Sequence, residues 1–148
     1  MYKKLISFAI AIMLLTTTTI AATGNTVPEA IVKDLNQHFT NVSEVRWSAT
    51  NNYYKASLNM QGKFMEVFYN LDGSFIGISR NITLDQLPLA LIKDVQAEKA
   101  NAYVAELFEL VTDQAGTEYY ITYKNGLETK VFRGAGDGWN LYQQFDNE

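Results

Sequence analysis

Two stretches of the chain carry the same pattern of apolar and polar positions, sixty residues apart. Residues 28–35 read Pro-Glu-Ala-Ile-Val-Lys-Asp-Leu, and residues 88–95 read Pro-Leu-Ala-Leu-Ile-Lys-Asp-Val. Apolar residues recur at helical spacing in both, as with Ile31 and Leu35 or Leu91 and Val95. A proline suits the first turn of a helix, where its missing N–H has no partner to lose. Each stretch therefore predicts a short amphipathic helix.

After each helix the pattern changes to an alternation with a period of two, which predicts antiparallel strands with one buried face. The Gln-Gly pair at 61–62 can supply the positive φ angles of a tight hairpin. A two-residue loop there places Leu58 opposite Met65 and Ala56 opposite Val67. A two-residue loop at 72–73 and a three-residue loop at 124–126, with Gly126 left-handed, predict three further pairs: Val67 with Ile78, Tyr69 with Ile76, and Tyr123 with Leu127.

The repeated pattern predicts an α+β fold made of two tandem α-β-β-β-β repeats, each a helix packed across an antiparallel four-stranded meander. The expected boundaries are 23–80 for the first repeat and 81–148 for the second, within one compact unit. The linking segment is short and holds no Gly/Ser run, so the two repeats should lie close together.

The first 22 residues have the pattern of a secretory signal peptide. Lys3 and Lys4 precede an apolar run over 5–15, and small residues follow at 21–22. The run is too short for a membrane span, so we expect cleavage and no membrane insertion afterwards. An uncleaved N-terminal anchor is the alternative. The expected location is the periplasm of a Gram-negative bacterium or the medium outside the cell.

Composition argues against several classes of function. Removing Lys3 and Lys4 leaves 10 of the 12 basic residues, against 16 acidic residues. The sequence shows no basic stripe of the kind that binds nucleic acid. The chain has no cysteine and a single histidine, His38. Nucleophilic triads and zinc sites usually need more of these residues. We therefore expect no catalytic residue, no metal and no cofactor, and a protein that is not an enzyme.

Aromatic residues are abundant on the strand positions expected to face away from the helices. Such rings can anchor a protein partner, or they can form a second core if the sheets curve or join. The candidate partner-binding residues are Tyr53, Phe64, Phe68, Phe75, Tyr120 and Phe132.

The motif at 45–47, Val-Arg-Trp, and the run at 67–73, Val-Phe-Tyr-Asn-Leu-Asp-Gly, resemble the PepSY-like family, as does the helix start at 87–88. The resemblance covers nearly the whole chain after the signal peptide. It implies a small exported bacterial protein related in fold to beta-lactamase-inhibitor protein. PepSY domains are associated with the restraint of peptidases, and the inhibitor relative binds an enzyme through its sheet. No inhibitory loop motif of that relative matches this sequence, so no inhibitory residue is carried over.

These observations favour an exported non-enzymatic module that binds a protein and thereby inhibits a peptidase or another envelope enzyme. The alternative is a structural or assembly accessory of the bacterial envelope without inhibitory activity. A hydrolase is the third hypothesis, and it has the least support.

Overall fold

The computed structural model describes residues 26–98, 102–136 and 138–147. The predicted signal peptide lies outside these residues. The described residues form two α-helices, α1 (Glu29–His38) and α2 (Leu89–Glu98), and one 3-10 turn, η1 (Leu84–Gln86). No helix within the described ranges is long and apolar enough to cross a membrane. The strands are β1 (Val42–Ala49), β2 (Tyr53–Met60), β3 (Lys63–Asn70), β4 (Phe75–Asn81), β5 (Tyr103–Thr112), β6 (Gly116–Lys124), β7 (Glu128–Ala135) and β8 (Gly138–Asp146).

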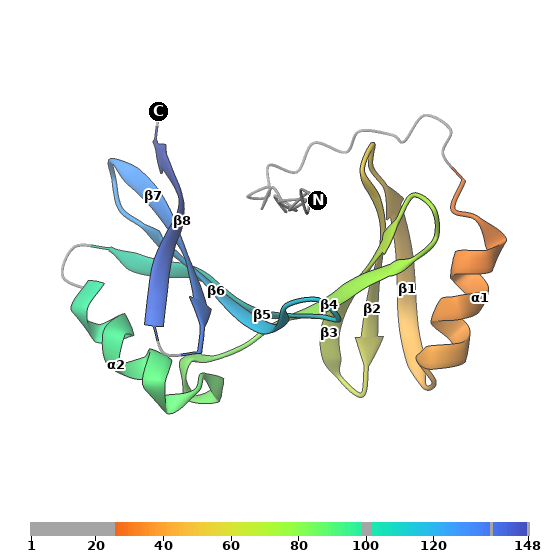
Figure 1. Cartoon of the computed structure of the whole chain (residues 1–148), viewed down its shortest axis with the longest axis horizontal. Coiled ribbons are helices and arrows are strands. Elements are labelled where there is room, and N and C mark those ends of the chain that lie inside the picture. Colours follow the sequence, from red (N-terminus) through yellow and green to blue (C-terminus); the bar gives the residue numbers. More distant parts are fainter. Residues whose placement is uncertain (1–25, 99–101, 137, 148) are drawn as a thin grey trace, which may run out of the picture.

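All eight strands belong to one antiparallel sheet, in which each strand pairs with its neighbours in the sequence (Figure 1). The pairing continues through the middle of the chain, where Ile78 of β4 lies opposite Val111 of β5 and Arg80 lies opposite Glu109. The Arg80 guanidinium also forms an ion pair with the Glu109 carboxylate.

The expected α+β fold of two tandem α-β-β-β-β repeats, each with a helix across its own meander, is wrong. The part of the chain that the structure describes is mostly β, with one continuous eight-stranded sheet and two helices of ten residues each. Two separate meanders would leave β4 and β5 as edge strands, each with a row of unpaired backbone N–H and C=O groups. Pairing β4 with β5 gives those groups partners and merges the meanders.

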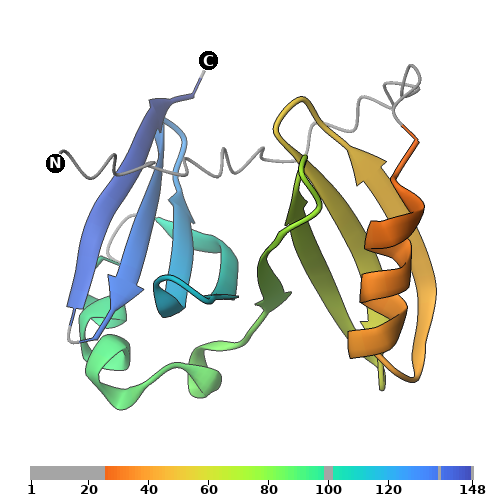
Figure 2. The same ribbon diagram turned by 45° about the vertical axis from the view of Figure 1, so that its right-hand side comes forward.

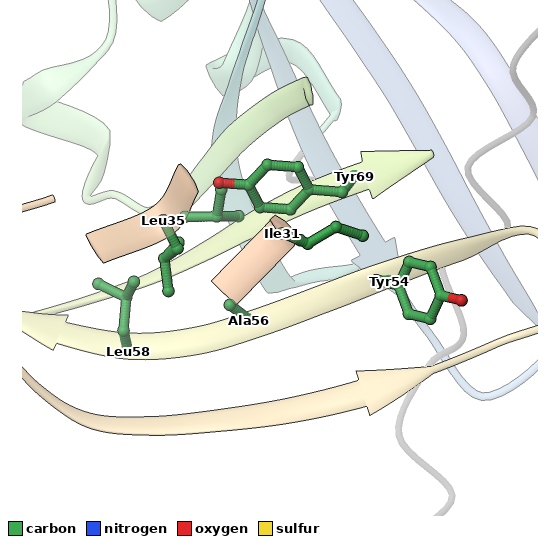
Figure 3. Close-up of a cluster of buried hydrophobic side chains, with 7 residues drawn as sticks. Ile31, Leu35, Tyr54, Ala56, Leu58 and Tyr69 are labelled. Carbon is green, nitrogen blue, oxygen red and sulfur yellow. The ribbon is translucent and has the colours of Figure 1, made fainter. Parts of the chain in front are cut away.

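The first buried cluster joins α1 to the strands of its half (Figure 3). Ile31 and Leu35 are at most 1% exposed and lie with Ala56, Leu58 and Tyr69, together with Tyr54 and Val67. The Tyr69 hydroxyl donates a hydrogen bond of 3.0 Å to the Asp34 carboxylate on α1. The cluster thus buries a large aromatic ring and still gives its polar atom a partner.

The second buried cluster contains Leu91 and Val95 of α2 with strand residues such as Ile121 and Tyr123. Two hydrogen bonds join the strands to the helix backbone. The Trp139 indole N–H donates to the Leu91 carbonyl at 2.9 Å, and the Tyr123 hydroxyl donates to the Val95 carbonyl at 3.2 Å. These bonds tie α2 to the sheet at two points, near its start at Leu91 and in its second half at Val95.

The hairpin at 61–62 has the predicted register. Leu58 lies opposite Met65 and Ala56 lies opposite Val67. Gln61 and Gly62 both have positive φ angles, 54° and 80°, as a type I′ turn requires.

The next hairpin agrees only in part with the prediction. Val67 lies opposite Ile78 as expected, but a register shift after Phe68 places Phe75, not Ile76, opposite Tyr69. The Asp72 carboxylate accepts hydrogen bonds from the backbone and the hydroxyl of Ser74, which gives the turn its own local structure.

The predicted three-residue loop at 124–126 is wrong. Tyr123 lies opposite Lys130, and Lys124 lies opposite Thr129. The Asn125 carboxamide oxygen accepts hydrogen bonds from the backbone N–H groups of Leu127 and Glu128, both at 2.8 Å. A side-chain-stabilised turn thus replaces the left-handed glycine, and Gly126 has no positive φ angle.

The close pairing of β4 with β5 requires a glycine at position 77, and this requirement can be tested. A Cβ atom there would lie 2.6 Å from the Val111 carbonyl oxygen. Gly77→Ala should therefore lower the free energy of unfolding by about 1–3 kcal/mol, because backbone cannot move aside cheaply. Urea denaturation of the mature chain measures this.

Gly126→Ala is the matched control, since no atom lies within 4 Å of its added Cβ. It should change stability by less than about 1 kcal/mol. Equal effects of the two substitutions would contradict the close approach of β4 and β5.

Candidate binding face of the sheet

The two faces of the sheet differ in what covers them. One face carries the two clusters that include helix residues, and Figure 1 places α1 and α2 at opposite outer sides of the molecule. Because strand residues alternate between faces, the neighbours of the clustered residues point the other way. We call this other side the open face. Its aromatic residues include Tyr53, Phe64, Phe68, Phe108, Tyr120 and Tyr142, and the register also places the exposed rings of Tyr103 and Phe145 on this face.

One ring pair of the open face lies on β2 and β3. Tyr53 and Phe68 meet edge to face, with ring centroids 5.7 Å apart. Phe68 is 8% exposed and Tyr53 is half-buried. Phe64, which lies four residues before Phe68 on the same face of β3, is 54% exposed. Phe68 therefore supports the exposed rings rather than serving as one of them.

A second ring group lies on β5, β6 and β8. Tyr120 stacks on Phe108 with a centroid distance of 5.1 Å and meets Tyr142 edge to face at 5.5 Å. Tyr120 is 6% exposed and packs with Leu110 and Val131 in a small cluster. Burial, together with a hydrogen bond from its hydroxyl to Glu118, raises the pKa of Tyr120.

Four of the six predicted binding residues lie on the open face: Tyr53, Phe64, Phe68 and Tyr120. The predicted placement of the other two on this face is wrong. Phe75 lies against the α1 cluster, with its ring 6.0 Å from that of Tyr69. Phe132 lies against the α2 cluster, opposite Ile121 and edge to face with Tyr123 at 5.9 Å.

Register explains both corrections. A shift by an odd number of residues moves a side chain to the opposite face of a sheet. The irregularity after Phe68 moves Phe75, and the longer turn after Lys124 moves Phe132. Sequence reasoning also missed Phe108. Its alternation with Leu107 was a usable signal, although a bulge between Val104 and Glu106 interrupts it.

Charged groups lie between the rings. The Lys55 ammonium lies 2.7 Å from the Glu66 carboxylate, and the Arg133 guanidinium lies 3.5 Å from Glu118. Glu106 differs from these pairs. Burial raises its pKa first, the negative charge of Glu66 adds to the rise, and the positive charge of Lys124 opposes it.

The described residues contain no group of three or more His, Cys, Asp or Glu side chains that could hold a metal ion. The sole histidine, His38, lies at the end of α1 and not on the open face. Its Nδ1 atom is 3.0 Å from the Asp34 carbonyl oxygen and 3.3 Å from the Asp34 carboxylate. The ring therefore contacts the preceding turn of its own helix, as expected of a polar side chain in the last turn.

No protein family model and no curated protein matches the chain. Solved structures do match it. A BLIP-like protein from Bacteroides fragilis superposes with a TM-score of 0.68 at 19% identity, covering 84% of this chain and 89% of that protein. A DUF2874 family protein from Bacteroides uniformis gives a TM-score of 0.72 at 15% identity, with coverage of 82% and 90%.

A third structure, from Bacteroides eggerthii, is of a protein named for a periplasmic location. It matches with a TM-score of 0.72 and 17% identity over 82% of this chain and 90% of that one. At such identities the likeness concerns the fold alone. Membership of the PepSY-like family is therefore not confirmed, whereas the expected relation to the inhibitor fold is: this chain has a BLIP-like fold.

Proposed function

We propose that the chain is an exported, non-enzymatic module that binds a protein partner through the open face of its sheet. Inhibition of an exported peptidase or another envelope enzyme is the specific form that we expect this binding to take. The signal-peptide pattern over residues 1–22 supports export, and so does the likeness to a protein named as periplasmic. The BLIP-like fold supports a binding role by analogy only.

The observation that carries the proposal is the arrangement of rings on the open face. Half-buried Tyr53, Phe108 and Tyr142 are held in place by the buried rings of Phe68 and Tyr120. Side chains that are already ordered lose little conformational freedom on binding, so their contact area converts efficiently into affinity. Exposed Phe64 adds an aromatic anchor beside this group.

The electrostatics of the face agree with this role. The ion pairs of Lys55 with Glu66 and of Arg133 with Glu118 can form a polar rim around the rings. Glu106 keeps a carboxylate where burial and Glu66 disfavour its charge. Perturbed groups of this kind cluster at functional surfaces, where stability is given up for binding.

The alternative function, a structural or assembly accessory, has one observation in its favour. Phe68 and Tyr120 are nearly fully buried, so part of the predicted aromatic surface acts as a second core. A scaffold would need that core, whether or not it captured a partner.

Two phenylalanines of β3 separate the contact role from the core role. Phe68→Ala should lower the free energy of unfolding by about 3–5 kcal/mol, because it empties a buried site. Phe64→Ala should cost less than about 1 kcal/mol, because its ring is largely in solvent. Thermal and urea denaturation of both variants test this. A large stability loss for Phe64→Ala would remove it from the set of exposed anchors.

Partner capture tests the function itself. The mature protein is used as bait in envelope extract, captured proteins are identified by mass spectrometry, and the candidate is then purified for calorimetry. Phe64→Ala should weaken binding about tenfold or more if the ring is an anchor. Leu89→Ala is the matched control, since Leu89 on α2 is 82% exposed and lies away from the open face. Unchanged binding of Phe64→Ala, or an equal loss for both variants, would count against the open face.

Glu106 predicts a pH-dependent stability difference. Its raised pKa means that the charged carboxylate destabilises the folded chain at neutral pH, and that this cost disappears as the pH falls below the pKa of the unfolded glutamate. Glu106→Gln should therefore be more stable than the wild type at about pH 7 and equal to it at about pH 4. Glu118→Gln should not gain stability at pH 7, because Arg133 and Tyr120 contact that carboxylate. A loss of stability in Glu106→Gln at neutral pH would refute the argument.

A further inference from the structure

The turn between β6 and β7 contains the only asparagine of the chain that a glycine follows, at residues 125 and 126. A glycine in this place leaves its own backbone nitrogen unhindered, because it has no Cβ atom. Gly126 is exposed, and no atom lies within 4 Å of the position that a Cβ would take. The turn therefore places an accessible nitrogen next to the side-chain carboxamide of Asn125.

The carboxamide of Asn125 is polarised by the turn. Its Oδ1 atom accepts hydrogen bonds from the backbone N–H groups of Leu127 and Glu128, both at 2.8 Å. When a nucleophile adds to Cγ, negative charge develops on this oxygen, and two donors already in place stabilise it as an oxyanion hole does. The Nδ2 amino group bonds to no other described residue, so it is able to leave as ammonia.

The backbone N–H of Gly126 is the potential nucleophile. It donates to no other residue of the described ranges, whereas the adjacent N–H of Asn125 donates to the Glu128 carbonyl at 3.1 Å. The Gly126 nitrogen can therefore lose its proton to solvent without breaking a hydrogen bond of the fold.

The residue after β8, Asn147, holds the turn from outside. Its Nδ2 group donates to the Asn125 carbonyl at 2.8 Å, and its backbone N–H donates to the Leu127 carbonyl at 2.8 Å. The Thr129 hydroxyl donates to the Asn147 Oδ1 atom at 2.8 Å. Figure 2 shows β8, at the left of the view, running to the same end of the sheet as this turn. These bonds keep the two backbone donors aligned with the carboxamide.

We propose that Asn125 is a site of self-promoted deamidation. The Gly126 nitrogen gives its proton to solvent base and forms a bond to Asn125 Cγ. The Cγ–Nδ2 bond breaks, and Nδ2 takes a proton from water and leaves as ammonia. Water then opens the succinimide ring. Opening at Cγ gives aspartate, and opening at the backbone carbonyl carbon gives isoaspartate.

The two products affect the sheet differently. Aspartate keeps an oxygen in the place of Oδ1 and adds a negative charge, so the turn persists. Isoaspartate adds a methylene group to the main chain, which moves Asn125 and Leu127 out of register with Asn147. The modification therefore acts on the end of the edge strand β8 as well as on the turn.

Rates of deamidation in the folded and unfolded chain test this inference. The mature protein is incubated in mildly alkaline buffer, and the product at residue 125 is measured by peptide mapping with mass spectrometry. A second sample is unfolded in guanidinium chloride at the same pH, temperature and ionic strength. The folded chain should react about tenfold faster or more, because only the folded turn supplies the two donors. An equal or slower rate in the folded chain would overturn the inference.

Two variants assign the roles. Gly126→Ala should lose most of the product while the chain stays folded, and persistence of the product would exclude the Gly126 nitrogen as nucleophile. Asn147→Ala should lower the rate of the folded chain towards that of the unfolded chain and leave the unfolded rate unchanged. An unchanged or higher folded rate in this variant would contradict the role of Asn147.

The pair at 72–73, Asp-Gly, is an internal comparison. The hydroxyl and the backbone N–H of Ser74 donate to the Asp72 carboxylate and hold its pKa below the usual range. An ionised carboxylate is a poor electrophile, so the same incubation should produce no isoaspartate at residue 72. Equal amounts of isoaspartate at 72 and 125 would mean that the following glycine alone sets the rate, and would refute the role of the turn.

Discussion

The pairing of β4 with β5 is the constraint on which the rest of the structure depends. It joins two meanders into one sheet, so neither meander keeps an edge strand at the centre of the molecule. Gly77 permits this pairing, because the Val111 carbonyl stands where a side chain would begin. The Arg80–Glu109 ion pair lies across the same two strands. Without this junction, the open face would be two separate surfaces rather than one continuous surface.

The two faces of the sheet differ in how completely they satisfy their polar atoms. On the helix-bearing face, the Tyr69 hydroxyl, the Tyr123 hydroxyl and the Trp139 indole N–H each bond to a helix group. On the open face, Thr122 and Gln143 hold the buried side-chain oxygens that lack partners in the described residues. The helix-bearing face therefore pairs these buried polar groups through its helices, and the open face has no helix to do so.

Burial on the open face arises without a covering helix. Neighbouring rings and aliphatic groups on adjacent strands cover Phe68 and Tyr120 and exclude solvent from them. Cross-strand ring contacts of this kind stabilise a sheet and also order the half-exposed rings at the margin. The same contacts can therefore serve stability and recognition, which is why ring burial alone does not separate a scaffold from a binding module.

Local chemistry is readable from the sequence, and it predicted the features that depend on it. The helical spacing of Ile31 with Leu35, and of Leu91 with Val95, identified residues that are buried. The Gln-Gly pair at 61–62 identified a tight hairpin and its register, because two adjacent left-handed residues allow few alternatives.

Tertiary structure decided what depends on the joining of distant strands. The faces of Phe75 and Phe132 follow from a register irregularity and from a turn that Asn125 stabilises, and a displacement of one residue is enough to reverse a face. The meanders merge through backbone hydrogen bonds, and every residue other than proline carries the same backbone groups. The pattern of side chains therefore does not predict this pairing. The open face is decided in the same way, because only the alignment of strands from both halves in one sheet brings its rings to one side.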